Sequence, residues 1–235
     1  MNAPTADLGE YSKKQHYGSR WSEFDDHIFK PGPLHPRPIL RSDRTNRILL
    51  YSGSFNPPHL GHKALLRHVF ENSQNINVIA ALVIPTDDQR LQEKKPTGQR
   101  KFSFQQRVKL WQGYGPSDWY WVCDRESDSA WHAFEAGLIQ SARRDGFKLK
   151  FVSVLGPDYA DMTKGVAWNY LREHIVSDIA RSADFVATEG ASLKQLPGCD
   201  PWETVDVDED RARDCANEHI AFLKRRMSLM MPSVL

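Results

Sequence analysis

Short apolar runs alternate along the middle of the chain with longer segments that have helical spacing. The run at residues 76–85 is almost wholly apolar and rich in β-branched residues, which is typical of a strand buried on both faces. Apolar residues at 65, 66, 69 and 70 would form one face of a helix. We therefore expect strands at 47–53, 76–85, 119–123, 148–156 and 184–190, and helices at 62–73, 103–114, 129–146 and 168–183.

This order of elements predicts the fold class. Strands that alternate with helices form βαβ units, which have right-handed crossovers and build a parallel sheet. The fold class that we expect is α/β, with a doubly wound, Rossmann-like parallel sheet. Ser103 is the expected N-cap of one helix and Gly146 closes another, whereas the charged residues 86–101 are expected to form a loop.

The first 45 residues differ from the rest of the chain. They are polar, and four prolines between Pro31 and Pro38 argue against a regular helix or a central strand there. We expect residues 1–45 to be an arm or tail that Trp21, Phe24 and Phe29 hold against a domain of residues 46–235. A chain of 235 residues is long enough for one large α/β domain with such an addition.

Charge and composition narrow the expected partners and location. The net charge is +1, so no overall field favours nucleic acid or a membrane, and neither is an expected partner. No apolar run approaches the ~18 residues of a membrane span, and the start of the chain lacks the apolar core of a secretory signal. Three scattered cysteines, at 123, 199 and 215, favour a reducing compartment. We expect a cytoplasmic or nuclear protein, and the sequence leaves its oligomeric state open.

Candidate chemistry gathers where strands end. Ligands of doubly wound sheets bind beyond the carboxyl ends of the strands, and Gly53, Gly156 and Gly190 end three of the expected strands. After Gly53 the chain places His59 and His62 at the start of a helix, where free N–H groups and the helix dipole favour a phosphate. Two histidines three residues apart can converge on one anionic group. The alternative interpretation is a tight turn with two solvated histidines.

The stretch GSFNPPHLGH, residues 53–62, carries a family resemblance. It resembles the HxGH signature of the nucleotidylyltransferase superfamily, and in particular the GxFxPxHxGH of nicotinamide mononucleotide adenylyltransferases. Class I aminoacyl-tRNA synthetases also use HxGH, but they are usually longer and need a lysine-rich second signature, which RRMSLMM near the chain end matches poorly. The resemblance implies that His59 and His62 are catalytic and that the nucleotide is bound by Gly53, Ser54, Phe55 and Asn56.

The resemblance extends over about residues 47–190 and implies further site residues. Residues 83–111 are similar to the family's second strand, basic loop and following helix, so Lys94, Lys95 and Arg107 are implied to face the phosphates. SVLGPDYA, residues 153–160, resembles the family's GAD segment and implies nucleotide contacts from Gly156 and Asp158. By the same resemblance, the pyridine pocket is lined by Trp131 and Trp168.

Each of these assignments has a structural alternative. The lysines are also consistent with a solvated loop, and Arg107 with a structural residue of its helix. Asp158 after Gly-Pro is also consistent with a helix cap, and aromatic residues at helix starts are often part of the core.

The chain departs from the family after the last expected strand. The family closes its site there with a Ser-Ser/Thr-x-x-(Ile/Val)-Arg string that holds the ATP phosphates, and no such string follows Gly190. Arg225 and Arg226 are possible replacements, although basic residues at a helix end are ordinarily solvated. The chain is therefore either a truncated or divergent member, or one that binds phosphate differently.

The resemblance implies a reaction and its partners. The implied activity is adenylyl transfer from ATP to nicotinamide mononucleotide, which gives NAD and pyrophosphate. Mg²⁺ would bridge the triphosphate oxygens and remain largely hydrated, so no metal site made by the protein is expected. The alternatives are a cytidylyl- or pantetheine-phosphate adenylyltransferase, a relative that only hydrolyses ATP, and a non-catalytic nucleotide-binding protein.

Overall fold

The computed structural model describes residues 3–19, 28–29, 37–94, 100–113, 118–126, 128–162, 165–166, 173–177, 179, 182–187 and 192–203. Residues 1–200 form one compact unit and residues 201–235 a second one. None of the helices in the described part of the chain combines the length and apolarity that crossing a membrane requires. That residues 1–45 are separable from residues 46–235 stays a prediction.

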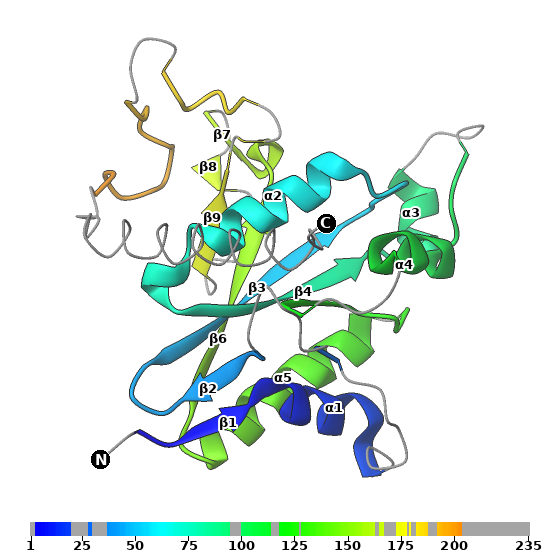
Figure 1. The fold of residues 1–235 in the computed structure, drawn as a ribbon. Helices are drawn as coiled ribbons and strands as arrows, with labels where there is room; N and C mark the ends of the chain where they lie inside the picture. The colour runs from blue at the N-terminus through cyan, green and yellow to red at the C-terminus, as the bar shows by residue number, and fades with distance from the viewer. Residues whose placement is uncertain are drawn as a thin grey trace, which may run out of the picture. The chain divides into compact units, whose positions relative to one another are not determined.

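A five-stranded parallel sheet organises the first unit (Figure 1). Its strand order is β5-β4-β3-β6-β9, so the chain moves outward from β3 through β4 to β5 and then returns to the other side of β3. This order is that of a doubly wound sheet, with its switch point between β3 and β6. The expected Rossmann-like α/β class is confirmed. The strands are β3 (Thr45–Gly53), β4 (Val78–Pro85), β5 (Tyr120–Val122), β6 (Lys148–Leu155) and β9 (Glu173–Val176).

Helices cover both faces of this sheet. Helices α2 (Leu60–Glu71) and α4 (Phe104–Gln112) pack on one face, where Leu49 and Tyr51 of β3 belong to one apolar cluster. Ile48 and Leu50 point to the other face and join the cluster of α1 (Leu8–Tyr17) and α5 (Asp128–Arg144). Burial on both faces explains why β4 reads as an unbroken apolar run. The helices predicted at 62–73, 103–114 and 129–146 are confirmed, with the Ser103 cap of α4.

The N-terminal segment is part of the core of this unit. Strands β1 (Thr5–Asp7) and β2 (Ile39–Arg41) pair antiparallel, and α1 between them lies along α5 (Figure 1). The Tyr11 hydroxyl donates to Asp145 at 2.5 Å. Burial, together with this hydrogen bond, raises the pKa of Tyr11 to about 12. Leu8 is completely buried. The sequence did not predict α1, because its residues are mostly polar.

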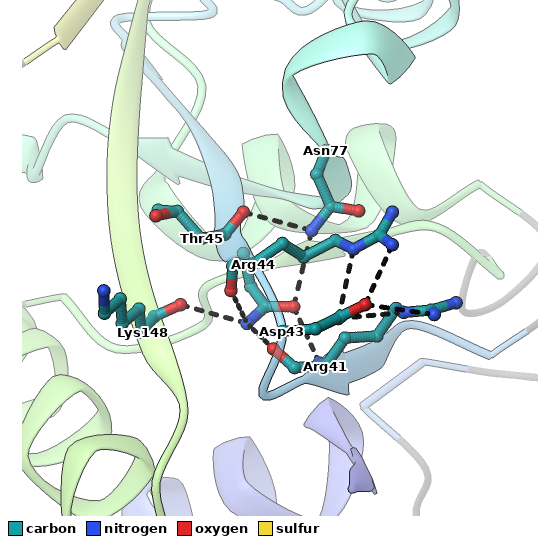
Figure 2. A network of polar contacts seen from close by, with 7 residues as sticks. Arg41, Asp43, Arg44, Thr45, Asn77 and Lys148 are labelled. Carbon is teal, nitrogen blue, oxygen red and sulfur yellow. Dashed lines mark hydrogen bonds and ion pairs between the residues drawn. The ribbon is translucent and has the colours of Figure 1, made fainter. Parts of the chain in front are cut away.

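A polar network fixes the turn that leads into β3 (Figure 2). Asp43 accepts hydrogen bonds from Arg44 and Arg41, which lower its pKa to about 2. The buried Asn46 amide donates to the carbonyl of Lys148 at 3.0 Å and exchanges two hydrogen bonds with the backbone of Arg41. The network therefore ties β2, β3 and β6 together at the amino end of the sheet.

Three expectations are corrected by the structure. The loop expected at 86–101 contains a helix, α3 (Asp88–Lys94). The helix expected at 168–183 is wrong where the structure describes it, because residues 173–176 form β9 and complete the sheet beside β6. The strand expected at 184–190 is also wrong over its described part, which forms a turn and a single bridge between Val186 and Leu193.

The remaining short elements connect these parts. A 3-10 helix, η2 (Gln74–Ile76), precedes β4, and another, η3 (Pro157–Tyr159), follows β6. Strands β7 (Ala160–Asp161) and β8 (Gly165–Val166) form a small antiparallel pair after η3.

Candidate functional site

The turn after β3 is shaped by a buried aromatic ring. Phe55 adopts a φ of 43°, which turns the chain sharply and buries its ring. A Cβ on Gly53 would lie 2.9 Å from two atoms of this ring, so glycine is required there to make room for Phe55. The conformation of Phe55 is therefore a structural reason for a glycine at position 53, independent of any contact with a nucleotide.

The two histidines lie together at the start of α2. Their rings are stacked with centroids 3.7 Å apart. The backbone N–H of His59 donates to Nδ1 of His62 at 3.2 Å, so a neutral His62 ring carries its proton on Nε2. A Cβ on Gly61 would lie 3.1 Å from two atoms of the His59 ring, which explains the glycine between the histidines.

Three aromatic side chains pack around the His62 ring. Phe55 meets it edge-on with centroids 5.1 Å apart, and Tyr51 and Trp111 lie at 6.5 and 6.4 Å. These three rings are buried, and they come from β3, the turn and α4. His62 itself is half-buried, so its ring has a fixed place at the surface of the site.

The start of α2 suits an anion. The helix dipole makes this end positive. The N–H of His62 in the first turn is already bonded to the His59 carbonyl at 3.0 Å. No acidic residue lies in the first turn of α2 to compete with a bound phosphate. This helix end follows β3 at the carboxyl edge of the sheet, beside the switch point at which doubly wound proteins bind ligands. The phosphate-binding role of His59 and His62 stays a prediction.

Arg107 lies beneath the turn. Its side chain is completely buried. It donates from Nη1 to the Ser54 carbonyl at 2.9 Å, from Nη2 to Asp88 at 2.7 Å and from Nε to the Phe102 carbonyl at 3.1 Å. The structure thus favours the alternative in which Arg107 is structural over the one in which it faces the phosphates.

Asn56 also makes contacts within the protein. Its amide donates to the Arg100 carbonyl at 3.1 Å and accepts from the Phe102 N–H at 2.7 Å. It therefore ties the turn to the segment that precedes α4. Lys94 is exposed at the end of α3, and Lys95 lies outside the described residues.

The end of β6 contributes the second part of the site. The register that pairs Leu50 of β3 with Ser153 of β6 brings Gly156 to the same edge of the sheet as Gly53. A Cβ on Gly156 would lie 2.6 Å from the Asp158 carboxylate, so this glycine makes room for Asp158. The Asp158 side chain is exposed in the first turn of η3, and its contact with a nucleotide stays a prediction.

Of the two aromatic walls of the expected pyridine pocket, Trp131 alone lies among the described residues, and the structure contradicts its assignment. Trp131 is 7% exposed and packs against Phe134 and Phe151, so it is a core residue on the α5 face of the sheet. Trp168, Gly190 and the two arginines at 225 and 226 lie outside the described residues.

One ionisable pair at the same edge is not predictable from the sequence. Asp124 follows β5, and its carboxylate lies 3.3 Å from Nε2 of His16, which is buried at the end of α1. The hydrogen bond from His16 lowers the pKa of Asp124. Burial raises the pKa of the neighbouring Cys123 thiol to about 11, so this cysteine is a poor nucleophile. No local motif in the sequence links His16 to Asp124, since they are far apart along the chain.

Metal ligands do not cluster in the described part of the protein. No three His, Cys, Asp or Glu side chains among those residues lie close enough to hold a metal ion together.

Comparison with known proteins places this geometry in context. A family model described as cytidylyltransferase-like matches residues 50–195, which include the histidine turn and the end of β6. Among solved structures, the chain is similar to the Plasmodium falciparum nicotinic acid mononucleotide adenylyltransferase complexed with APC. The TM-score is 0.31 and the identity 16%, over 48% of this chain and 52% of that one, so the match spans about half of the Plasmodium protein. No curated protein matches the chain.

Proposed function

Because this chain belongs to the cytidylyltransferase-like family, we propose that it is an adenylyltransferase that transfers AMP from ATP to nicotinamide mononucleotide. The products are NAD and pyrophosphate. ATP and the mononucleotide are the partners of the site, and neither nucleic acid nor a membrane is required. The proposed location is the cytoplasm or the nucleus.

The observation that carries the proposal is the histidine pair. His62 is held by the His59 backbone on its Nδ1 side, which leaves a proton on Nε2 of the neutral ring. The stacked rings lie at a helix start that has no acidic residue in its first turn. Donors that are already oriented toward the place where charge develops stabilise a transition state without reorganisation.

The reaction requires no covalent bond to the protein. The 5′-phosphate of the mononucleotide attacks the α-phosphorus of ATP, a new phosphorus–oxygen bond forms, and the bond to the leaving pyrophosphate breaks. The protein contributes orientation and charge stabilisation, which account for most of the catalysis in phosphoryl-type transfers. His62 would donate to the reacting phosphates from Nε2, with His59 beside it.

Magnesium enters as part of the substrate. Mg²⁺ binds oxygen ligands at phosphates and keeps several waters, so MgATP needs no cage of protein carboxylates. Gly156 and Asp158 lie at the same sheet edge as the histidine turn. We propose Asp158 as the residue that accepts a hydrogen bond from the ribose or the amide of a substrate.

The choice of nicotinamide mononucleotide rests on the resemblance of GSFNPPHLGH to that subfamily. The rival acceptors are cytidylyl-transfer substrates and pantetheine phosphate, and the rival activities are ATP hydrolysis and nucleotide binding without turnover.

The test is NAD formation by the purified chain with MgATP and nicotinamide mononucleotide. His62→Ala is expected to lower kcat by about 10²–10³-fold, the typical cost of one donor to developing charge. His68→Ala is the matched control, because His68 is exposed on the same helix and lies in its last turn. NAD formation that survives His62→Ala would overturn the catalytic assignment. ATP hydrolysis without NAD, or tight ATP binding without product, would replace the proposed function with one of its rivals.

A further inference from the structure

Arg107 contacts three separate segments from one buried position. Its guanidinium donates to the carbonyl of Ser54 in the histidine turn, to the carboxylate of Asp88 at the start of α3, and to the carbonyl of Phe102 just before α4. The distances are 2.9, 2.7 and 3.1 Å, and the side chain has no exposed surface. The planar fork of an arginine reaches three acceptors in fixed directions, which the single ammonium of a lysine does not.

A second tie joins the same segments. Asn56, two residues after Ser54, accepts from the Phe102 N–H at 2.7 Å and donates to the Arg100 carbonyl at 3.1 Å. The turn is thus attached to residues 100–102 by two side chains and to the start of α3 by one. Asp88 and Phe102 lie at the two ends of residues 88–102. Through Arg107, both ends of this segment are attached to the histidine turn.

We propose that Arg107 is a positioning residue that holds α3 and residues 100–102 in register with the histidine turn. This inference rests on the proposed function for its catalytic consequence alone. That consequence is that Lys94 and His62 contact the same polyphosphate. Arg107 does not contact the phosphates, because the guanidinium is buried and directed at three protein acceptors. Arg107 would therefore affect catalysis by positioning other residues and not by placing its own charge next to the substrate.

Arg47 provides a matched control, because it makes similar contacts away from the histidine turn. Arg47 of β3 donates to the Ile76 carbonyl at 2.7 Å and to the Glu173 carboxylate at 2.7 Å, and is largely buried. It joins β3 to β9 and η2 but contacts no part of the histidine turn that the structure describes. Arg47→Met therefore reproduces the loss of a structural guanidinium without the loss of positioning.

The first arm of the test needs no nucleotide. Hydrogen exchange is measured by mass spectrometry on peptides covering residues 53–60, 86–94 and 100–104 in Arg107→Met, Arg107→Lys, Arg47→Met and the wild-type chain. We expect exchange to rise in all of these peptides for both Arg107 variants, and to stay at the wild-type level in them for Arg47→Met. An Arg107→Met variant that raises exchange there no more than Arg47→Met would overturn the proposal. Where Arg107→Met does not fold, Arg107→Lys takes its place, and exchange in these peptides no higher than in Arg47→Met would overturn the proposal equally.

The second arm measures the Kd for MgATP by displacement of a fluorescent ATP analogue. We expect both Arg107 variants to raise this Kd by about tenfold or more, and Arg47→Met to change it by less than about twofold. Arg107→Lys distinguishes positioning by the guanidinium from binding of phosphate by a positive charge. A residue that binds phosphate as a point charge tolerates lysine, so wild-type affinity in Arg107→Lys would overturn positioning by the fork. If the wild-type chain binds no MgATP, the proposed function fails, and the exchange measurements alone decide the role of Arg107.

Discussion

At the residue scale, His62 uses its two ring nitrogens for different tasks. Nδ1 accepts from the His59 backbone and fixes the ring at the helix start, and Nε2 is the proposed donor to phosphate. Amide side chains separate these tasks, because asparagine offers an acceptor near the Nδ1 position and glutamine offers a donor near the Nε2 position.

We expect His62→Asn to keep the thermal stability of the wild type and to lose turnover by about 10²–10³-fold. His62→Gln is expected to retain more turnover than His62→Asn, because an N–H group remains near the Nε2 position. Thermal unfolding and kcat for NAD formation are the measurements. Equal activity in the two variants would show that the Nε2 donor is not the feature that matters.

A second prediction at this scale concerns Gly61. An alanine Cβ at this position would lie 3.1 Å from the His59 ring and displace it from its stack on His62. Because alanine is the better helix former by up to about 1 kcal/mol, Gly61→Ala should not destabilise the protein. We expect unfolding temperature to be maintained while the Kd for MgATP rises. Unchanged affinity in a stable Gly61→Ala variant would mean that the stacked arrangement is not needed for binding.

At the element scale, the Glu173 carboxylate adds side-chain contacts to the backbone pairing of β9 with β6. Glu173 accepts from Arg47 and from Lys150, which lower its pKa from 4.5 to about 2. The folded state thus binds the proton of Glu173 less readily than the unfolded state does. The resulting stabilisation is complete above about pH 5 and is lost as the pH falls toward about 2.

Glu173→Gln removes this contribution. We expect a lower unfolding temperature at neutral pH and a weaker dependence of stability on pH between about pH 5 and pH 2. Glu71→Gln, at an exposed position at the end of α2, removes the same charge and serves as the control. Thermal unfolding across a pH series is the measurement. Identical curves for the two variants would contradict the role of Glu173.

The sequence predicted most of these elements because their patterns are local. The unbroken apolar run of β4 and the helical spacing of the apolar residues of α2 are both visible within about a dozen consecutive residues, so each element is predictable from its own sequence. Helices α1 and α3 escaped prediction because they are rich in charged and polar residues and gain their stability from tertiary contacts such as Tyr11 with Asp145 and Arg107 with Asp88. Strand β9 was read as a helix because its place beside β6 is set by sheet pairing, which local periodicity does not record.

The candidate site was predictable to a similar extent. Residues 53–62 gave the histidine pair and its glycines, since each has a local mechanical role. The buried contacts of Arg107 and the pairing of His16 with Asp124 join segments distant in the chain, so only the fold reveals them.

At the scale of the whole molecule, the N-terminal segment completes the core of the unit formed by residues 1–200. Leu8 is completely buried with α5 and the sheet, whereas Leu60 is 84% exposed. We expect Leu8→Ala to lower the free energy of unfolding by about 2–5 kcal/mol, and Leu60→Ala to change it by less than about 0.5 kcal/mol. Chemical denaturation measures both. An equally small effect of Leu8→Ala would mean that the segment is only loosely attached.

The central proposal for the whole molecule is transfer of the AMP group of ATP. The most direct measurement follows the α-phosphorus. The purified chain is mixed with nicotinamide mononucleotide and MgATP labelled at the α-phosphate, and the labelled product is identified. We expect the label to appear in NAD and unlabelled pyrophosphate to be released. Label that appears in ADP, or that remains in ATP while the chain is folded and saturated, would contradict it.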